Sequence, residues 1–292
     1  MSGHAIVDAH QHLWEMAEHP QTWMNPETDS AINRDFVVND LRAATASVVD
    51  LAATVVVQSV NDANETTHLL ARAEQAPDLI AGVVGWADLT ASDLEEQLCR
   101  WRDAPGGHRL VGLRHLVQNE PDEGFLDRPE VRRGLRIAAR HELAFDLLVN
   151  GVHLPAAVRV ASDLPETRFV LDHLGKPPLR SGDLAQWTAQ MRELGRLPNV
   201  WAKVSGLVTE AVPGERSAAL LQPVADVALQ AFGPGRLMFG SDWPVCLLAA
   251  DYAEVVSIAQ QLLSSLSETE YRRAFAGNAV EFYRLSLGAR PV

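Results

Sequence analysis

The sequence Ile6-Val-Asp-Ala-His-Gln-His-Leu-Trp14, close to the N-terminus, decides how the rest of the chain is interpreted. Its first residues are typical of a short buried strand. Alternate side chains of a strand share a face, so we expect Asp8, His10, His12 and Trp14 to project together. Two imidazoles one residue apart can then aim at one metal ion or oxyanion. A satisfied polar cluster is the alternative, but the His-x-His pattern at the end of an apolar run favours a functional site.

The composition is that of an ordinary globular enzyme. The chain has 292 residues, of which 47% are hydrophobic and 22% charged, which argues against disorder. Its 25 basic and 38 acidic residues give a net charge of −13, so the surface should repel nucleic acid and anionic lipid. Cys99 and Cys246 lie far apart and form no Cys-x-x-Cys pair, which argues against a disulfide framework. With no signal segment and no long apolar run, we expect a cytoplasmic protein without a membrane partner.

Apolar runs rich in Val, Ile and Leu alternate with helical stretches along the whole chain. After the first strand they occupy residues 54–60, 79–86, 110–117, 143–149, 168–174, 199–205 and 236–242. Eight such strands in this length predict an α/β protein with one (β/α)₈ TIM barrel spanning residues 1–292. An open doubly wound sheet is the alternative, but it would need a Gly-rich phosphate loop where this chain has His-Gln-His.

Between the first two strands, residues 14–36 show no clear period and predict a long loop, a kind that is usually functional in compact domains. Asn39 and Asp40 then predict the start of a helix that runs to about Val49. Further along, Ser92 is expected to cap a helix and Pro129 to open one.

Polar residues recur where the predicted strands end, which is the catalytic end of such barrels. They are His10, His12, Gln58, Trp86, Asp88, Arg114, His115, Asp172, His173, Lys203 and Asp242. Ionisable groups at the ends of apolar strands are costly to bury unless they are used or paired. Their common placement therefore predicts an active site.

Asp242 is the best candidate for a general base, because a carboxylate near histidines can take the proton of an attacking water. It could instead cap a helix before Pro244. His173 lies before Gly175 and a pair of prolines, which would fix its direction, although a purely structural hydrogen bond is the alternative.

The remaining candidates are substrate contacts. Arg114 and His115 are adjacent, so only one can point into the barrel, and alternation does not say which. Lys203 could bind a substrate oxygen or pair with Asp172 or Asp242. Gln58 ends the second strand and is a further candidate contact. His153 is a weaker candidate. Four indoles could line a pocket for a sugar-like ring or pack at its rim: those of Trp14, Trp23, Trp86 and Trp243.

The ordered motifs resemble those of the amidohydrolase superfamily, specifically its sugar lactonases for L-fuconolactone and L-rhamnonolactone, and more distantly the 2-pyrone-4,6-dicarboxylate lactonases. They are Asp-Ala-His-Gln-His-Leu-Trp (8–14), Val-Val-Gln-Ser (56–59), Gly-Leu-Arg-His (112–115), Phe-Asp-Leu-Leu-Val (145–149), Leu-Asp-His-Leu-Gly-Lys-Pro (171–177), Lys-Val-Ser-Gly-Leu (203–207) and Phe-Gly-Ser-Asp-Trp-Pro-Val (239–245). By this resemblance His10, His12, His173 and Asp242 form the catalytic core.

The departures from the pattern concern metal. Metal-dependent members of the superfamily add a His at the end of the fifth strand, but the fifth strand of this chain, residues 145–149, contains no His. Binuclear members add a bridging Lys or Glu on the fourth strand, where this chain has Arg114 and His115. His10, His12 and Asp242 would still suffice as three zinc ligands. The lactonases of the superfamily resemble enzymes that work without a metal. We therefore expect that no cofactor is required and that zinc binds only opportunistically.

The leading functional hypothesis is a hydrolase that opens the lactone of a small sugar acid. A dicarboxylate substrate would need several converging cations, and strand ends offer only Arg114 and Lys203, which favours a neutral lactone. The alternatives are a metal-dependent decarboxylase of aromatic or unsaturated acids on the same barrel and, more distantly, a non-enzymatic sugar-binding barrel. The identity of the lactone and the existence of a homo-oligomer stay open.

Overall fold

The strands form one parallel sheet in chain order. The computed structural model describes residues 4–46, 50–212, 214 and 216–287. The strands are β1 (Ile6–Gln11), β2 (Leu51–Val57), β3 (Ile80–Gly85), β4 (Leu110–His115), β5 (Ala144–Leu147), β6 (Phe169–Leu171), β7 (Val200–Val204) and β8 (Leu237–Phe239). Beyond the end of β8, Asp242 N donates to His10 O at 2.8 Å and His12 N donates to Trp243 O at 2.6 Å. These bonds bring the last strand against the first, and the predicted (β/α)₈ barrel is confirmed.

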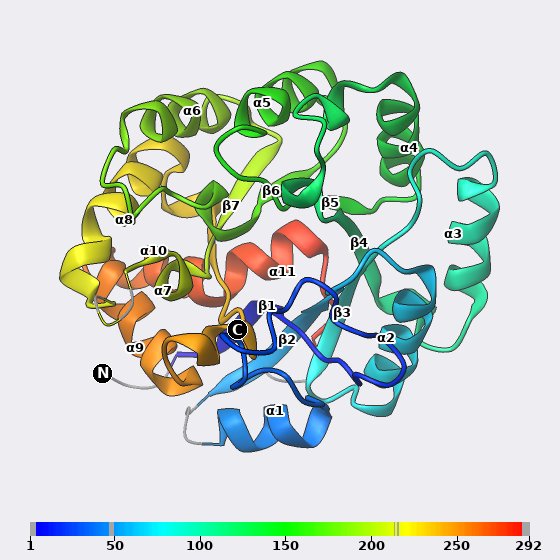
Figure 1. The fold of residues 1–292 in the computed structure, drawn as a ribbon, viewed down its shortest axis with the longest axis horizontal. Helices are drawn as coiled ribbons and strands as arrows, with labels where there is room; N and C mark the ends of the chain where they lie inside the picture. Colours follow the sequence, from blue (N-terminus) through cyan, green and yellow to red (C-terminus); the bar gives the residue numbers. More distant parts are fainter. Residues whose placement is uncertain (1–3, 47–49, 213, 215, 288–292) are drawn as a thin grey trace.

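Helices surround the strands (Figure 1). They are α1 (Val38–Thr45), α2 (Ala63–Gln75), α3 (Leu94–Asp103), α4 (Pro129–Arg140), α5 (Leu154–Asp163), α6 (Ala185–Gly195), α7 (Leu207–Glu210), α8 (Ala218–Phe232), α9 (Tyr252–Leu262), α10 (Glu268–Arg272) and α11 (Asn278–Tyr283). Within the barrel, small and branched strand residues such as Val7, Val55 and Val57 form a buried cluster with Phe282 and Tyr283 of α11. In the described part of the chain, no helix has the length and apolar character needed to cross a membrane.

Strand β1 is not regular, and this changes which of its side chains face the barrel. Its pairing with β2 shifts register between Asp8 and Gln11. Asp8 Oδ1 accepts hydrogen bonds from Ser241 N (2.8 Å) and His10 N (3.1 Å), while Oδ2 accepts from Ser241 Oγ (2.6 Å) and Tyr252 OH (3.0 Å). Asp8 therefore ties β1 to the segment after β8 and to α9. The expectation that Asp8 shares a face with His10 was wrong, because the irregularity breaks the alternation.

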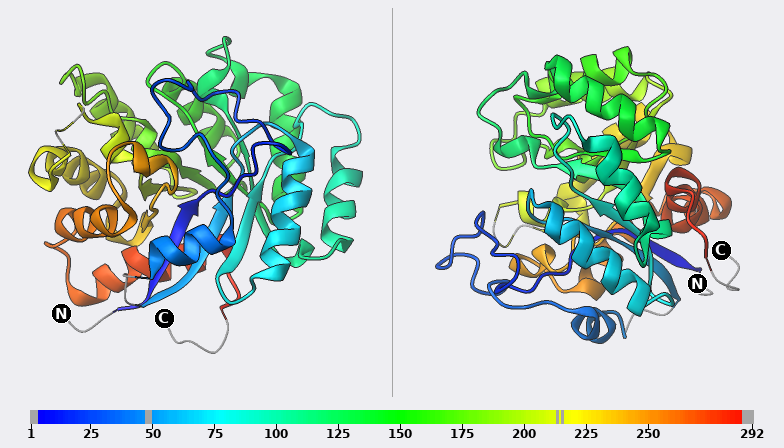
Figure 2. Two further views of the ribbon diagram at one scale, coloured as in Figure 1. Left: turned by 60° about the horizontal axis from the view of Figure 1, so that its bottom comes forward. Right: turned by 90° about the vertical axis from the view of Figure 1, so that its right-hand side faces the viewer.

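The long segment at residues 14–36, which we call the mouth loop, is confirmed as a loop. Trp14 and Phe36 exchange backbone hydrogen bonds of 3.0 and 2.9 Å, and Trp14 Nε1 donates to Arg34 O at 2.7 Å. These bonds close the base of the loop. The loop then passes across the barrel end toward which the strands point (Figure 2).

Helix starts differ from the sequence expectation by one or two residues. Helix α1 begins at Val38, and Asp40 accepts a hydrogen bond from Val37 N at 3.0 Å, so Asp40 supports the first turn from within it. The helix ends at Thr45, and Val49 lies outside the described residues. Helix α3 follows Asp93 rather than Ser92, whereas α4 begins at Pro129 as expected.

The hydrogen bonds by which Asp8 joins β1 to the segment after β8 lead to a prediction about stability. Replacing Asp8 with Ala leaves the N–H groups of His10 and Ser241 buried without their acceptor, which should cost about 3 kcal/mol or more of unfolding free energy. The control Tyr252→Phe removes one hydroxyl hydrogen bond and should cost about 1 kcal/mol. Urea denaturation followed by circular dichroism measures both. Equal effects of the two variants would contradict the assigned role of Asp8.

Candidate active site

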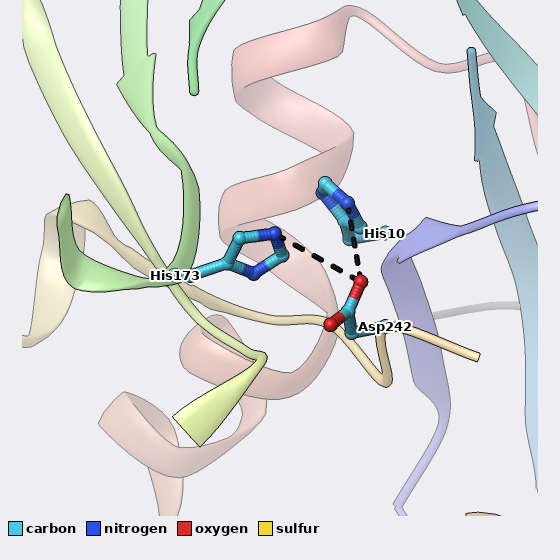
Figure 3. Close-up of side chains that lie close together, drawn as sticks. All are labelled: His10, His173 and Asp242. Atoms are coloured by element: carbon cyan, nitrogen blue, oxygen red, sulfur yellow. Dashed lines mark ion pairs between the residues drawn. The ribbon is translucent and has the colours of Figure 1, made fainter. Parts of the chain in front are cut away.

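Three histidines surround one carboxylate at the mouth of the barrel. Asp242 Oδ1 lies 3.3 Å from His12 Nε2, 3.7 Å from His10 Nε2 and 3.8 Å from His173 Nε2. Figure 3 shows His10 and His173 approaching Asp242 from different elements. The structure thus brings together all four residues that were predicted to be catalytic.

Unusual backbone geometry aims two of these side chains. His173 has φ 53° and Asp242 has φ 58°, in the left-handed region that non-glycine residues avoid at a cost of about 1–2 kcal/mol. Ser205 Oγ lies 2.9 Å from His173 Nδ1 and fixes the ring. Gly206, at φ 64°, lies so close to the ring of His173 that an added Cβ would be 2.5 Å from His173 Nδ1. Only glycine fits there, and neither Ser205 nor Gly206 was predicted, because the sequence does not show that β7 ends beside His173.

Hydrogen bonding fixes the tautomer of His12. Its Nδ1 lies 2.8 Å from Val57 O, and a carbonyl can only accept, so Nδ1 carries a proton. In the neutral ring the lone pair on Nε2 then faces His10 Nε2 at 3.2 Å and Asp242 Oδ1 at 3.3 Å. A lone pair facing a carboxylate oxygen at this distance is unfavourable unless a proton or a cation lies between them.

The protonation states suit acid–base chemistry. Burial alone would raise the pKa of Asp242, but His173, His12 and His10 outweigh it and hold that pKa below its usual range, so the carboxylate is ionised at neutral pH. Burial lowers the pKa of His173, and burial together with Lys203 lowers the pKa of His10 well below its usual value. These two rings are therefore neutral beside an ionised carboxylate.

A fully buried ionic network forms the floor of the site. Lys203 Nζ lies 2.6 Å from Asp146 Oδ2, 2.9 Å from Asp172 Oδ1 and 2.9 Å from His10 Nδ1. Arg114 binds the other oxygen of Asp172 at 3.1 Å. Burial opposes ionisation of Asp172, but Lys203, His10 and Arg114 keep its pKa well below the usual range. Lys203 pairs with Asp172 and Asp146 rather than with Asp242, and it does not reach the cavity.

Of the adjacent pair on β4, Arg114 faces the site. His115 is turned away: Trp86 Nε1 donates to its Nδ1 at 3.0 Å, its Nε2 lies 2.7 Å from Glu120 Oε1, and its ring stacks on Phe125. Burial lowers the pKa of His115. This geometry gives no support to His115 as a substrate contact.

Gln58 also lies behind the wall of the cavity. Its backbone oxygen accepts from Arg114 NH2, and its Nε2 donates to Arg114 O at 3.1 Å. Gln58 thus positions Arg114 instead of reaching the cavity. His153, the weaker candidate, is held by Asn150 and Glu120 and likewise does not line it.

The cavity above Asp242 has a volume of about 160 Å³, which suits one small molecule. Of the four indoles that the sequence offered as pocket lining, Trp14 and Trp23 of the mouth loop form part of the wall, whereas Trp86 binds His115 and Trp243 packs on Phe36. Polar residues beyond the strand ends complete it and were not predicted as site residues: Ser59, Gln118, Asn119, Lys176 and, in α7, Thr209 and Glu210. No local pattern distinguishes such residues from ordinary surface ones.

The mouth residues fit a divalent metal. In a tetrahedral zinc site with bonds of 2.0–2.1 Å, ligand atoms lie about 3.3 Å apart. The Nε2 atoms of His10 and His12 and Asp242 Oδ1 are separated by 3.2 to 3.7 Å, and ligand atoms of His10, His173 and Asp242 lie within 4.8 Å of one another. The charges of Lys203 and Arg114 are matched by Asp146 and Asp172, so the carboxylate of Asp242 has no fixed cation of its own.

Comparisons with known proteins agree with this geometry. An amidohydrolase family model matches residues 7–285. The chain is 38% identical to L-fucono-1,5-lactonase of Burkholderia ambifaria, covering 96% of this chain and 95% of the relative, and 39% identical to L-fucono-1,5-lactonase of Burkholderia multivorans, covering 96% of each. Crystal structures of an amidohydrolase from Burkholderia multivorans superpose with TM-scores of 0.90 (with bound HEPES) and 0.88 (with bound zinc) at 37% identity, covering 97% of this chain and 100% of the other. The chain belongs to the amidohydrolase family.

Proposed function

We propose that this protein hydrolyses the lactone of a small neutral sugar acid, of the L-fucono-1,5-lactone type. The observation that carries the proposal is an ionised carboxylate, Asp242, surrounded by three imidazoles at the base of a cavity walled by indoles. The near full-length similarity to two L-fucono-1,5-lactonases supports the same substrate class.

The chain's own residues supply a complete proton cycle. Asp242 orients a water and takes its proton as the oxygen attacks the lactone carbonyl. Negative charge then develops on the carbonyl oxygen, where an N–H group of His173 or of Arg114 can stabilise it. When the ring C–O bond breaks, Asp242 returns the proton to the leaving oxygen, which becomes a hydroxyl of the product. Water is consumed, and the carboxylate is regenerated.

Charge pairing on the cavity wall favours a neutral substrate. Lys176 Nζ is 2.7 Å from Glu210 Oε1, and Arg114 is bound to Asp172. Each of these cations already has an anion, so two substrate carboxylates would enter without free partners and would lose their hydration. Trp23 can instead cover the face of a sugar ring while the polar wall residues bind hydroxyls.

The first functional prediction concerns Asp242. Asp242→Asn keeps the size of the side chain but removes the basic oxygen, so turnover of L-fucono-1,5-lactone should fall by at least ~10²-fold with the fold intact. A pH-indicator assay measures the rate. The exposed variant Asp226→Asn is the matched control and should be fully active. A normally folded Asp242→Asn enzyme with a near wild-type rate would overturn the proposed base and direct attention to His173.

The second concerns substrate charge. We expect kcat/KM for 2-pyrone-4,6-dicarboxylate to be at least ~10²-fold below that for L-fucono-1,5-lactone, because burying an unpaired carboxylate costs several kcal/mol. Parallel assays at fixed ionic strength provide the comparison. Equal efficiency on both substrates would show that the paired cations on the wall open to receive anions.

The third concerns metal. We propose that zinc bound by His10, His12 and Asp242 would polarise the carbonyl as a Lewis acid but is not required, because a lactone carbonyl is electrophilic and N–H donors are already present. The chelated enzyme, verified as metal-free by elemental analysis, should keep more than about half of its activity. Loss on stripping with recovery on adding zinc would make these residues essential ligands.

A further inference from the structure

A second group of histidines and acids lies between the mouth loop and α2. Glu15, Glu18 and His19 come from the loop, and His68 comes from the helix. Ligand atoms of Glu18, His19 and His68 all lie within 4.8 Å of one another. None of these residues takes part in the lactone chemistry proposed above.

Contacts orient His68 toward the middle of this group. Its Nδ1 lies 2.8 Å from Glu18 Oε2, and its Nε2 lies 2.9 Å from Glu15 Oε2. Arg72 donates to Glu15 Oε2 at 2.6 Å and to His68 Nε2 at 3.0 Å. A carboxylate on the far nitrogen of an imidazole is the arrangement that commonly orients a metal-binding histidine.

His19 supplies the independent observation. Only 6% of its surface is exposed, and its Nδ1 is buried with no hydrogen-bond partner among the described residues. Its ring meets that of His68 edge to face, with centroids 5.3 Å apart, and its Nδ1 lies 3.5 Å from Asp62 Oδ2. Asp62 therefore faces this nitrogen without making a hydrogen bond to it, and a buried ring nitrogen that lacks a hydrogen bond is costly, a cost that a bound cation would remove.

The local charges favour a cation. Four carboxylates lie around the two imidazoles, and Arg72 is the basic residue paired with one of them; the carboxylates belong to Glu15, Glu18, Asp62 and Glu65.

We propose that Glu18, His19 and His68 form a binding site for a zinc-type divalent metal that fastens the mouth loop to α2. Imidazole nitrogens select zinc, nickel or copper over magnesium and calcium, which prefer oxygen ligands. On binding, the metal would replace the proton that His68 Nδ1 shares with Glu18. The ring proton would move to Nε2, and Arg72, which donates to Nε2 in this structure, would turn fully toward Glu15. Because Trp23 lies on the same loop, this site would fix one wall of the substrate cavity.

The test uses full-length Asp242→Asn protein, in which the mouth site is weakened. After chelation, Zn²⁺ is titrated by isothermal calorimetry, and Co²⁺ absorption reports nitrogen ligation. We expect Glu18→Gln or His68→Asn, added to this protein, to remove one equivalent of bound metal or to weaken its binding at least ~10-fold. His141→Asn is the matched control, since His141 also lies near a surface carboxylate, 3.6 Å from Glu95, but without a second histidine in its cluster. It should change nothing.

Two results would overturn the proposal. One is unchanged stoichiometry and affinity after His68→Asn or Glu18→Gln in protein whose circular dichroism is normal. The other is an equal loss caused by His141→Asn, which would indicate adventitious binding at surface histidines. A third readout is limited proteolysis: zinc should protect the mouth loop of the Asp242→Asn protein but not of the variant that also carries His68→Asn, and equal protection of both would count against the site.

Discussion

Lys203 has no access to water, and neither have the two carboxylates that hold it, Asp146 and Asp172. Buried charges persist only when each is paired, so this set leaves little freedom to the residues that complete it. Arg114 must stay on Asp172, and His10 must stay beside Lys203. Tyr283 of α11 donates to Asp146 at 2.7 Å, so the helix that fills the opposite end of the barrel also supports the floor of the site.

Above this balanced floor, Asp242 is the carboxylate whose partners are three imidazoles instead of a fixed cation. A carboxylate in such surroundings remains ionised, yet its charge is shared with groups that can gain or lose protons. The left-handed backbone at His173 and Asp242 is the conformational cost of aiming both side chains at one point. Rigid strands next to these turns offset that cost and keep the distances between Asp242 and the imidazoles short.

The sequence was sufficient for what depends on periodicity and on the ends of strands. Eight apolar runs predicted the barrel, and their ends predicted that His10, His12, His173 and Asp242 would meet. It failed where the outcome depends on a neighbour from elsewhere in the chain. The irregular register of β1 separates Asp8 from His10, and the orientation of Arg114 is decided by Asp172, which belongs to another strand end. Helix starts moved by a residue or two because more than one polar side chain can cap.

The side chains that complete the cavity lie beyond the strands, which explains why the sequence did not predict them. Lys176, in the segment after β6, contacts Glu210 at the end of α7, and Gln118 and Asn119 follow β4. Their positions depend on loop conformation, for which single-sequence patterns carry little information. The acid–base groups, in contrast, sit on or next to strands whose spacing the barrel determines.

Gly206 has a consequence for how such an enzyme can acquire new substrates. Its Cα faces His173 and Asp242 so closely that any side chain there would displace the imidazole, so that side of the cavity is closed to variation. Gln118 and Asn119 form a different part of the wall, from the segment after β4, and among the described residues no hydrogen bond joins their side chains to the proton-transferring groups. Libraries that aim to redirect the enzyme toward other sugar stereochemistries should therefore randomise that part of the wall and leave the glycine fixed.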